Sequence, residues 1–129
     1  MDELRAALEE ARVIQGAAMI DGCRIERSTG IVTDRDTGED RETFTLVWEG
    51  DCRYPRADSG TRVIVTGETI TPASPVVIIP WDIDGILPED RVTCTSSVSP
   101  AMVGRIVWVT DASPRTYQSA VHLTCREVR

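Results

Sequence analysis

The sequence predicts a mainly β fold: a small antiparallel β-barrel or sandwich of about seven strands with one N-terminal α-helix and an extended polar hairpin. Short apolar, β-branched runs recur along the chain, and turns rich in Gly, Pro and Asp separate them. Helical spacing is confined to the start of the chain. For 129 residues without a linker-like stretch, we expect a single domain, 1–129, with the helix in 1–19 and the barrel in 21–129.

Apolar residues at three- and four-residue spacing predict the N-terminal helix. Asp2 can cap it, and the acids of its first turn suit the positive end of the helix dipole. The apolar stripe is narrow and rich in alanine, and it consists of Leu4, Ala7, Leu8, Ala11, Ile14 and Ala18. We expect this stripe to pack on the protein's own sheet; a neighbouring subunit is the alternative.

Alternation and β-branched composition predict the strands that follow. Gly50-Asp51 is expected to break or bulge one of them, and the continuous apolar run of residues 75–80 is typical of a strand buried on both faces. The predicted strands are Cys23–Arg27, Thr43–Trp48 with Cys52–Tyr54, Thr61–Ile70, Pro75–Pro80, Arg91–Thr95, Val103–Thr110 and Ser119–Val128.

The segment Thr29–Glu42 is long and polar for a simple hairpin connection, with Asp36-Thr37-Gly38 as its expected turn. We expect this arm, or the loop Arg53–Arg62, to project toward a channel or a partner; a mobile, solvated hairpin is the alternative. Its acids would repel DNA and its arginines would pair with another subunit. The candidate partner-interface residues are Arg35, Asp36, Asp40, Arg41, Arg53, Arg56 and Asp58.

The formal net charge is −7, and residues 1–60 hold 14 acids against 8 arginines. This surface disfavours proteins that grip DNA or RNA. The longest apolar run, Pro75–Trp81, is too short for a membrane helix, and early acids argue against a secretory signal. All 14 basic residues are arginine, and neither lysine nor asparagine occurs, which indicates a GC-rich coding genome.

Candidate chemistry is sparse. Cys23, Cys52, Cys94 and Cys125 lack the close pair of a zinc knuckle, so we expect four small buried hydrophobes on strands rather than metal ligands or disulfides. The single histidine, His122, should lie opposite Cys125 on its strand. A nucleophile–base pair with Cys94 or Cys125 would need a geometry that sequence does not show.

Two acidic clusters could offer oxygen ligands to calcium, but neither contains a glycine-centred calcium loop. We expect solvated turns whose apolar residues tuck inward. The clusters are Asp82, Asp84, Glu89 and Asp90, and Asp34, Asp36, Glu39 and Asp40. Phosphate-loop, dinucleotide and hydrolase motifs are absent, and three tryptophans suit a small β core as well as a stacking platform. We therefore expect no cofactor and no enzymatic activity.

Several segments, in this order, resemble a family of small head-to-tail connector proteins from tailed phages of actinobacteria. The segments are 25–30 (IERSTG), 33–39 (TDRDTGE), 47–53 (VWEGDCR), 80–83 (PWDI), 88–93 (PEDRVT), 99–105 (SPAMVGR) and 107–110 (VWVT). The N-terminal helix fits as well. One departure is Glu89, where the family pattern leads us to expect glycine, so the local turn type differs.

The resemblance implies a head-completion, or stopper, protein of the virion neck, made in the host cytoplasm. Its subunits would form a homo-oligomeric ring of six or twelve copies, below the portal or adaptor and above the tail terminator or tail tube. Packaged double-stranded DNA would pass through without specific binding, and no membrane is involved. The alternatives are another neck role, adaptor or tail terminator, and a generic small β-barrel module that binds a ligand or protein. An adaptor should be richer in helix.

Overall fold

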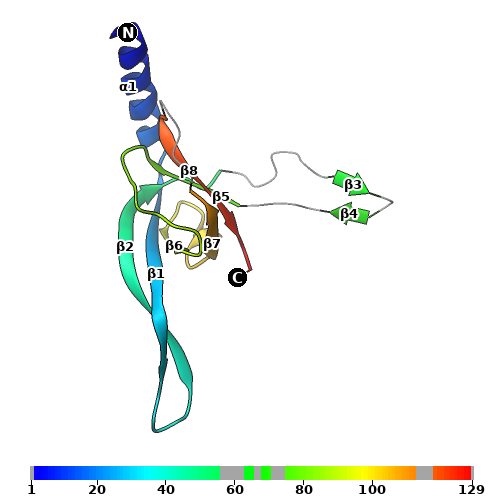
Figure 1. Ribbon diagram of the computed structural model, residues 1–129. Helices are drawn as coiled ribbons and strands as arrows, with labels where there is room; N and C mark the ends of the chain where they lie inside the picture. The colour runs from blue at the N-terminus through cyan, green and yellow to red at the C-terminus, as the bar shows by residue number, and fades with distance from the viewer. Residues whose placement is uncertain (1, 56–62, 66–67, 71–74, 113–117, 129) are drawn as a thin grey trace.

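The structure is a computed structural model in which residues 2–55, 63–65, 68–70, 75–112 and 118–128 are described (Figure 1). Within these ranges it holds one α-helix, eight strands and a short 3₁₀ helix. In chain order they are α1 (Asp2–Ala17), β1 (Asp21–Thr33), β2 (Asp40–Cys52), β3 (Val63–Val65), β4 (Glu68–Ile70), β5 (Val76–Pro80), β6 (Arg91–Ser96), η1 (Pro100–Met102), β7 (Ile106–Asp111) and β8 (Ala120–Arg126).

Six of these strands form one antiparallel sheet in the order β2-β1-β6-β7-β8-β5. The sheet is open, but its ends meet at one point just beyond β2. There Arg53 and Ile78 exchange backbone hydrogen bonds of 2.8 and 2.9 Å. The predicted mainly β fold, with one N-terminal helix and a polar hairpin, is confirmed.

The inner face of the curled sheet forms the core. Its largest fully buried side chains include Ile25, Ile79 and Leu123. Four fully or almost fully buried cysteines, one each from β1, β2, β6 and β8, join them with free thiols. Cys23 and Cys94 lie directly opposite each other across β1 and β6. The cysteines are thus small core residues on strands, as predicted, although three of them come from central parts of the sheet that sequence spacing does not relate.

Three strand predictions were wrong in detail. β2 continues through Gly50 without a break. Gly50 fits this strand because the Trp48 ring lies over it, so closely that an added Cβ would be 2.6 Å from the ring. Residues 61–70 contain two paired strands, β3 and β4, rather than one. Residues 103–105 are not in a strand, because η1 and the positive φ of Gly104 turn the chain before β7 begins at Ile106.

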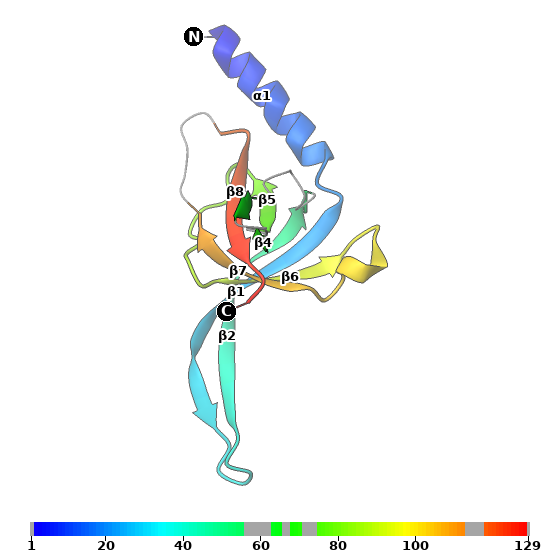
Figure 2. The same ribbon diagram turned by 90° about the vertical axis from the view of Figure 1, so that its right-hand side faces the viewer.

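The expected packing of the helix on its own sheet holds only in part: α1 contacts β5 and β8, and Leu8, Ala11 and Ala18 of the stripe are partly buried. No residue of α1 is buried, and Leu4 and Ile14 are 48% and 61% exposed. The helix continues outward from the end of the body, and Figures 1 and 2 show it opposite the β1–β2 hairpin. The chain leaves the helix through Met19, which is buried against Ile78 and Ala120. The chain therefore passes from the end of the helix into the first residues of β1, and the helix does not lie across a sheet face.

Candidate functional site

The distal halves of β1 and β2 form an arm, residues 28–45, that extends well beyond the body (Figures 1 and 2). Its strands pair from Asp21–Cys52 out to Thr33–Asp40, with register shifts after Ile25 and Ser28. Such bulges bend a strand pair and increase its twist. At the second shift Gly30 adopts a φ of +133°, a conformation that favours glycine. The arm is thus a continuation of the sheet rather than a loose loop.

An ion pair anchors the arm at its root. Arg27 of β1 donates from Nε and Nη2 to the two carboxylate oxygens of Asp90, at 2.9 and 3.0 Å. Asp90 is 1% exposed and also accepts the backbone N–H of Leu87 at 2.8 Å. Nη2 of Arg27 reaches the carbonyl oxygen of Gly85 at 2.7 Å as well. The hydrogen bond to Asp90 raises the pKa of Arg27, which favours the charged guanidinium.

A second contact holds the opposite strand of the root. The guanidinium of Arg91 stacks on the Phe44 ring, 3.5 Å from its centroid, an arrangement that attracts a cation to the face of an aromatic ring. Arg91 also bonds Glu26 at 3.0 Å, and Glu26 pairs with Arg24 at 3.2 Å. We call these contacts together with the Arg27–Asp90 pair the root collar. The collar fixes both strands of the arm to β6 and to the segment before it.

Sequence reasoning missed the root collar and misjudged one of its members. Asp82, Asp84 and Glu89 are exposed, as expected for a solvated turn, but Asp90 is buried. Ile86 tucks inward as predicted, whereas Trp81 and Leu87 are exposed. The signal that could have found Asp90 is its position directly before a strand, where a short acid can accept the backbone N–H of a preceding turn.

Glu89 has a φ of +75°. This left-handed conformation is uncommon for residues other than glycine, and it occurs where the resembled family led us to expect glycine. The Glu89 side chain pairs with Arg126 of β8. The turn therefore keeps the glycine-type backbone, and the ion pair ties it to β8.

Backbone and side-chain hydrogen bonds shape the tip of the arm. Asp34 donates its N–H to the carbonyl of Glu39, and Gly38 donates to the carbonyl of Asp34, both at 2.8 Å. The Asp34 carboxylate accepts the N–H of Asp36 at 2.8 Å, and Gly38 has a φ of +74°. The predicted turn at Asp36-Thr37-Gly38 is confirmed, and it is a preformed feature.

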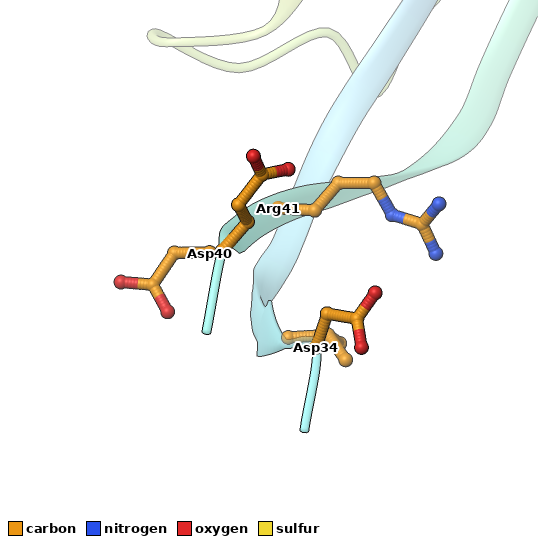
Figure 3. Close-up of a pocket in the computed structure, with 5 residues that line it drawn as sticks. Asp34, Asp40 and Arg41 are labelled. Carbon is orange, nitrogen blue, oxygen red and sulfur yellow. The ribbon is translucent and has the colours of Figure 1, made fainter. Parts of the chain in front are cut away.

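The tip is charged and open to solvent. A hollow of about 340 Å³ is lined by Val32, Asp34, Glu39, Asp40 and Arg41 (Figure 3). Asp40 and Arg41 leave β2 on opposite sides, as successive strand residues do. Asp40 accepts the Thr33 hydroxyl at 2.6 Å. In the described part of the chain, neither Arg35 nor Arg41 is joined to an acid by an ion pair.

The structure brings four of the seven predicted interface residues together at this tip: Arg35, Asp36, Asp40 and Arg41. Arg53 lies elsewhere, half-buried at the bridge to β5. Arg56 and Asp58, and with them most of the predicted loop Arg53–Arg62, lie outside the described residues. The tip and Arg53 are therefore two separate surfaces, at opposite ends of β2.

The thiols are poor candidates for nucleophiles. Burial raises the pKa of Cys94, and it raises that of Cys125 to about 12. A hydrogen bond with Cys23 and burial raise the pKa of Cys52. Because the thiolate is the reactive form, these shifts oppose reactivity.

His122 is exposed on β8, on the face opposite the buried Cys125, as predicted. In the described ranges no group of His, Cys, Asp and Glu side chains could hold a metal ion.

A groove of about 220 Å³ opens on the body, far from the arm tip. Apolar residues line it, and an exposed ion pair between Arg105 and Glu127, with an N–O distance of 2.6 Å, borders it. Its lining consists of Tyr54, Pro55, Pro75, Val76, Met102, Arg105, Val107 and Glu127.

No helix in the described part of the chain is long and apolar enough to cross a membrane.

Comparison with solved structures shows a similar fold in protein SF1141 from Shigella flexneri 2a, known from a solution structure. The two chains are 17% identical, with a TM-score of 0.54, over 86% of this chain and 94% of that one. At this identity the likeness concerns the fold alone. Comparison with curated protein sequences gave no match.

A protein-family model, described as a family of unknown function (DUF6093), matches residues 11–126. The match begins within α1 and ends at the last residue of β8, so it includes the arm, the root collar and all of the groove lining except Glu127. Because this match spans most of the sequence, the chain belongs to the DUF6093 family.

Proposed function

We propose that this protein is a head-to-tail stopper, or head-completion, subunit in the neck of a tailed phage. It acts as a structural part of the virion and not as an enzyme. Its copies form a ring that retains packaged DNA and offers a docking surface to the tail. The portal or adaptor lies above this ring, and the tail terminator or tail tube lies below it.

The observation that carries this proposal is the arm. A ring subunit needs a rigid body and an extended element that reaches beyond it, and the arm extends the sheet outward with both strands fixed by the root collar. Its acids give the tip a negative charge, which repels a phosphate backbone. Arg35 and Arg41, which form no ion pair with acids in the described part of the chain, remain available to a neighbouring subunit.

The alternatives fit less well. An adaptor is expected to be rich in helix, whereas the described residues hold eight strands and one α-helix. A module with a small-molecule ligand would need a mostly apolar pocket of roughly 300 Å³ or more. The hollow of about 340 Å³ at the tip is lined mainly by charged residues, and the apolar groove holds only about 220 Å³.

Deletion of the gene tests the role directly. We expect the deletion phage to produce heads that have lost their DNA and carry no tails, visible by negative-stain microscopy. Expression of the intact chain from a plasmid should restore complete particles. Full, tailed particles without the protein would contradict the stopper role.

A shorter change tests the arm. Residues 32–41 are replaced by a two-residue Asn-Gly turn, which suits a tight hairpin between the paired residues Ile31 and Glu42 and leaves the root collar intact. We expect a folded protein that no longer supports infectious, DNA-filled particles. The matched control replaces Asp34 and Asp36 with Asn and keeps both arginines; it should retain more activity than the shortened arm. Normal infectivity of the shortened arm would overturn the role assigned to the tip.

A further inference from the structure

Helix α1 presents an apolar surface that its own chain leaves uncovered. The helix touches the body through Arg12, whose guanidinium stacks 3.6 Å from the Trp81 ring centroid and whose Nε donates to the Gln118 carbonyl at 3.3 Å. Leu4 and Ile14 remain about half or more exposed. The helix has 16 residues, only slightly more than the roughly 12–15 below which isolated helices are marginal in water, and most helical stability in proteins comes from packing of the apolar face. A covering partner would therefore stabilise the helix as well as bury its stripe.

The charges beside this stripe are asymmetric. By helical geometry, Leu4, Ala7 and Ile14 share one face. Glu3 and Glu10 border that face on the side away from Arg12. The uncovered apolar face therefore has an acidic edge, and Glu10 lies one turn before Ile14.

The groove on the body complements this helix face in hydrophobicity and offers it an arginine. Its walls are apolar, and the guanidinium of Arg105 stands at its border with about half of the side chain exposed. Arg105 bonds Glu127 only across an exposed pair, which is of small energetic value and easily exchanged for another partner. The helix strip and the groove are both apolar, and the acidic edge of the strip can compete with Glu127 for Arg105 at the border of the groove.

We propose that helix α1 of one copy packs over this groove of a second copy, with the Ile14 side chain inserted between the apolar walls and Glu10 facing Arg105. Helix and groove are different surfaces, so the contact passes from copy to copy in one direction. Contacts of this kind close into rings when the rotation between copies permits. The inference rests on the proposed ring and names the contact that builds it.

Cysteine cross-linking tests the pairing in the full-length chain. One preparation carries Ile14→Cys and the other carries Met102→Cys; the native thiols are buried. After mixing at about millimolar concentration and mild oxidation, we expect a disulfide-linked dimer of the two variants. Each variant alone should stay mostly uncross-linked. Glu9→Cys, on the far side of the helix, is the control and should cross-link to Met102→Cys at least five times less.

Three results would overturn the contact: no mixed dimer, an equal yield from the Glu9→Cys control, or efficient cross-linking of Ile14→Cys with itself. The last result would indicate symmetric pairing of helices. It would replace the groove by a second helix as the covering surface.

A charge exchange tests the polar part of the contact. We expect Arg105→Glu to weaken self-association measured by sedimentation by about fivefold, the upper end of the range of an exposed ion pair. Adding Glu10→Arg should restore association to within about twofold of the original chain. A double variant no better than Arg105→Glu alone would contradict the pairing.

These tests separate the contact from the stopper role. A failed cross-link, together with deletion particles that lose their DNA, would remove the contact and leave the role. A successful cross-link, together with full, tailed deletion particles, would remove the role and leave the contact.

Discussion

Two projections of this molecule, the β1–β2 arm and helix α1, are held in different ways. The two strands of the arm hydrogen-bond to each other as the outward continuation of the β1–β2 pair, and the root collar fixes both of them. The helix is held through Arg12 and the short connection at Met19, and it buries no residue of its own. The arm is held in place by contacts within its own chain, whereas the helix leaves an apolar stripe exposed.

This difference indicates two roles in assembly. A preformed arm can present Arg35 and Arg41 to a neighbour without a large ordering cost, because its backbone is already fixed. A helix with an uncovered stripe gains most of its stability when a neighbour covers it. We therefore expect the arm to keep its shape before and after ring formation, and the helix to become ordered on contact.

Removing the buried acid of the root collar should have the largest effect. Asp90→Ala leaves Arg27 without its partner and the N–H of Leu87 without its acceptor. We expect a loss of about 2–3 kcal/mol in the free energy of unfolding, below the usual cost of breaking a fully buried pair because Arg27 is partly exposed. Urea denaturation measures it. Asp90→Asn, which can still accept from Leu87, should lose less; equal losses would mean that charge alone matters.

Alkaline pH should lower the free energy of unfolding of the body, which carries both projections. Burial raises the pKa of Cys125 from its ordinary 9.0 to about 12, so the unfolded thiol ionises first. The stabilisation that comes from keeping the Cys125 thiol protonated is complete below about pH 9. It is lost as pH rises toward 12, by up to about 1.4 kcal/mol per pH unit. Cys125→Val should flatten the decline in unfolding free energy between pH 9 and 11. An unchanged slope would show that this thiol does not cause it.

The attachment of the helix is weaker than that of the arm. Arg12→Ala removes the stacking on Trp81 and the hydrogen bond to Gln118. We expect about 1 kcal/mol of local destabilisation, seen as faster hydrogen exchange in α1 with little change in the unfolding midpoint of the body. Arg5→Ala, further from the body, serves as the control. A shift of the global midpoint as large as that of Asp90→Ala would erase the contrast between the two projections.

The smallest effect concerns the turn beside the root collar. Glu89→Gly relieves a left-handed backbone but loses the pair with Arg126. The relief, roughly 1 kcal/mol, should slightly exceed the value of an exposed ion pair, so the protein should gain up to about 0.5 kcal/mol in thermal or urea unfolding. Glu89→Ala loses the pair and keeps the strain, and it should be less stable than either. A stabilising Glu89→Ala would contradict this balance.

Much of the fold could be predicted because local signals agreed with it. Alternation along 43–48 and the apolar run of 75–80 indicated β2 and β5, and the turn at Gly38 followed from its residues. The helix was correctly placed, but its packing only in part, because an apolar stripe shows which face seeks cover and not what covers it. Gly50 suggested a break, since sequence does not show that the Trp48 ring lies over it.

The candidate site was predictable only in part. The charged tip is a local feature, and four of its residues were identified from 29–42 alone. The root collar joins residues that lie 63 positions apart in the case of Arg27 and Asp90. The groove likewise gathers residues from 54 to 127. Such sites depend on strand order, which local patterns do not determine.

The contrast between the two projections is tested most directly by hydrogen exchange of the purified protein, followed by mass spectrometry, before and after ring assembly. Amides that bond across β1 and β2 should be protected in the free chain, whereas those of α1 should exchange rapidly and become protected only on assembly. Protection of α1 in the free chain equal to that of the arm, or an arm without protection, would contradict this account.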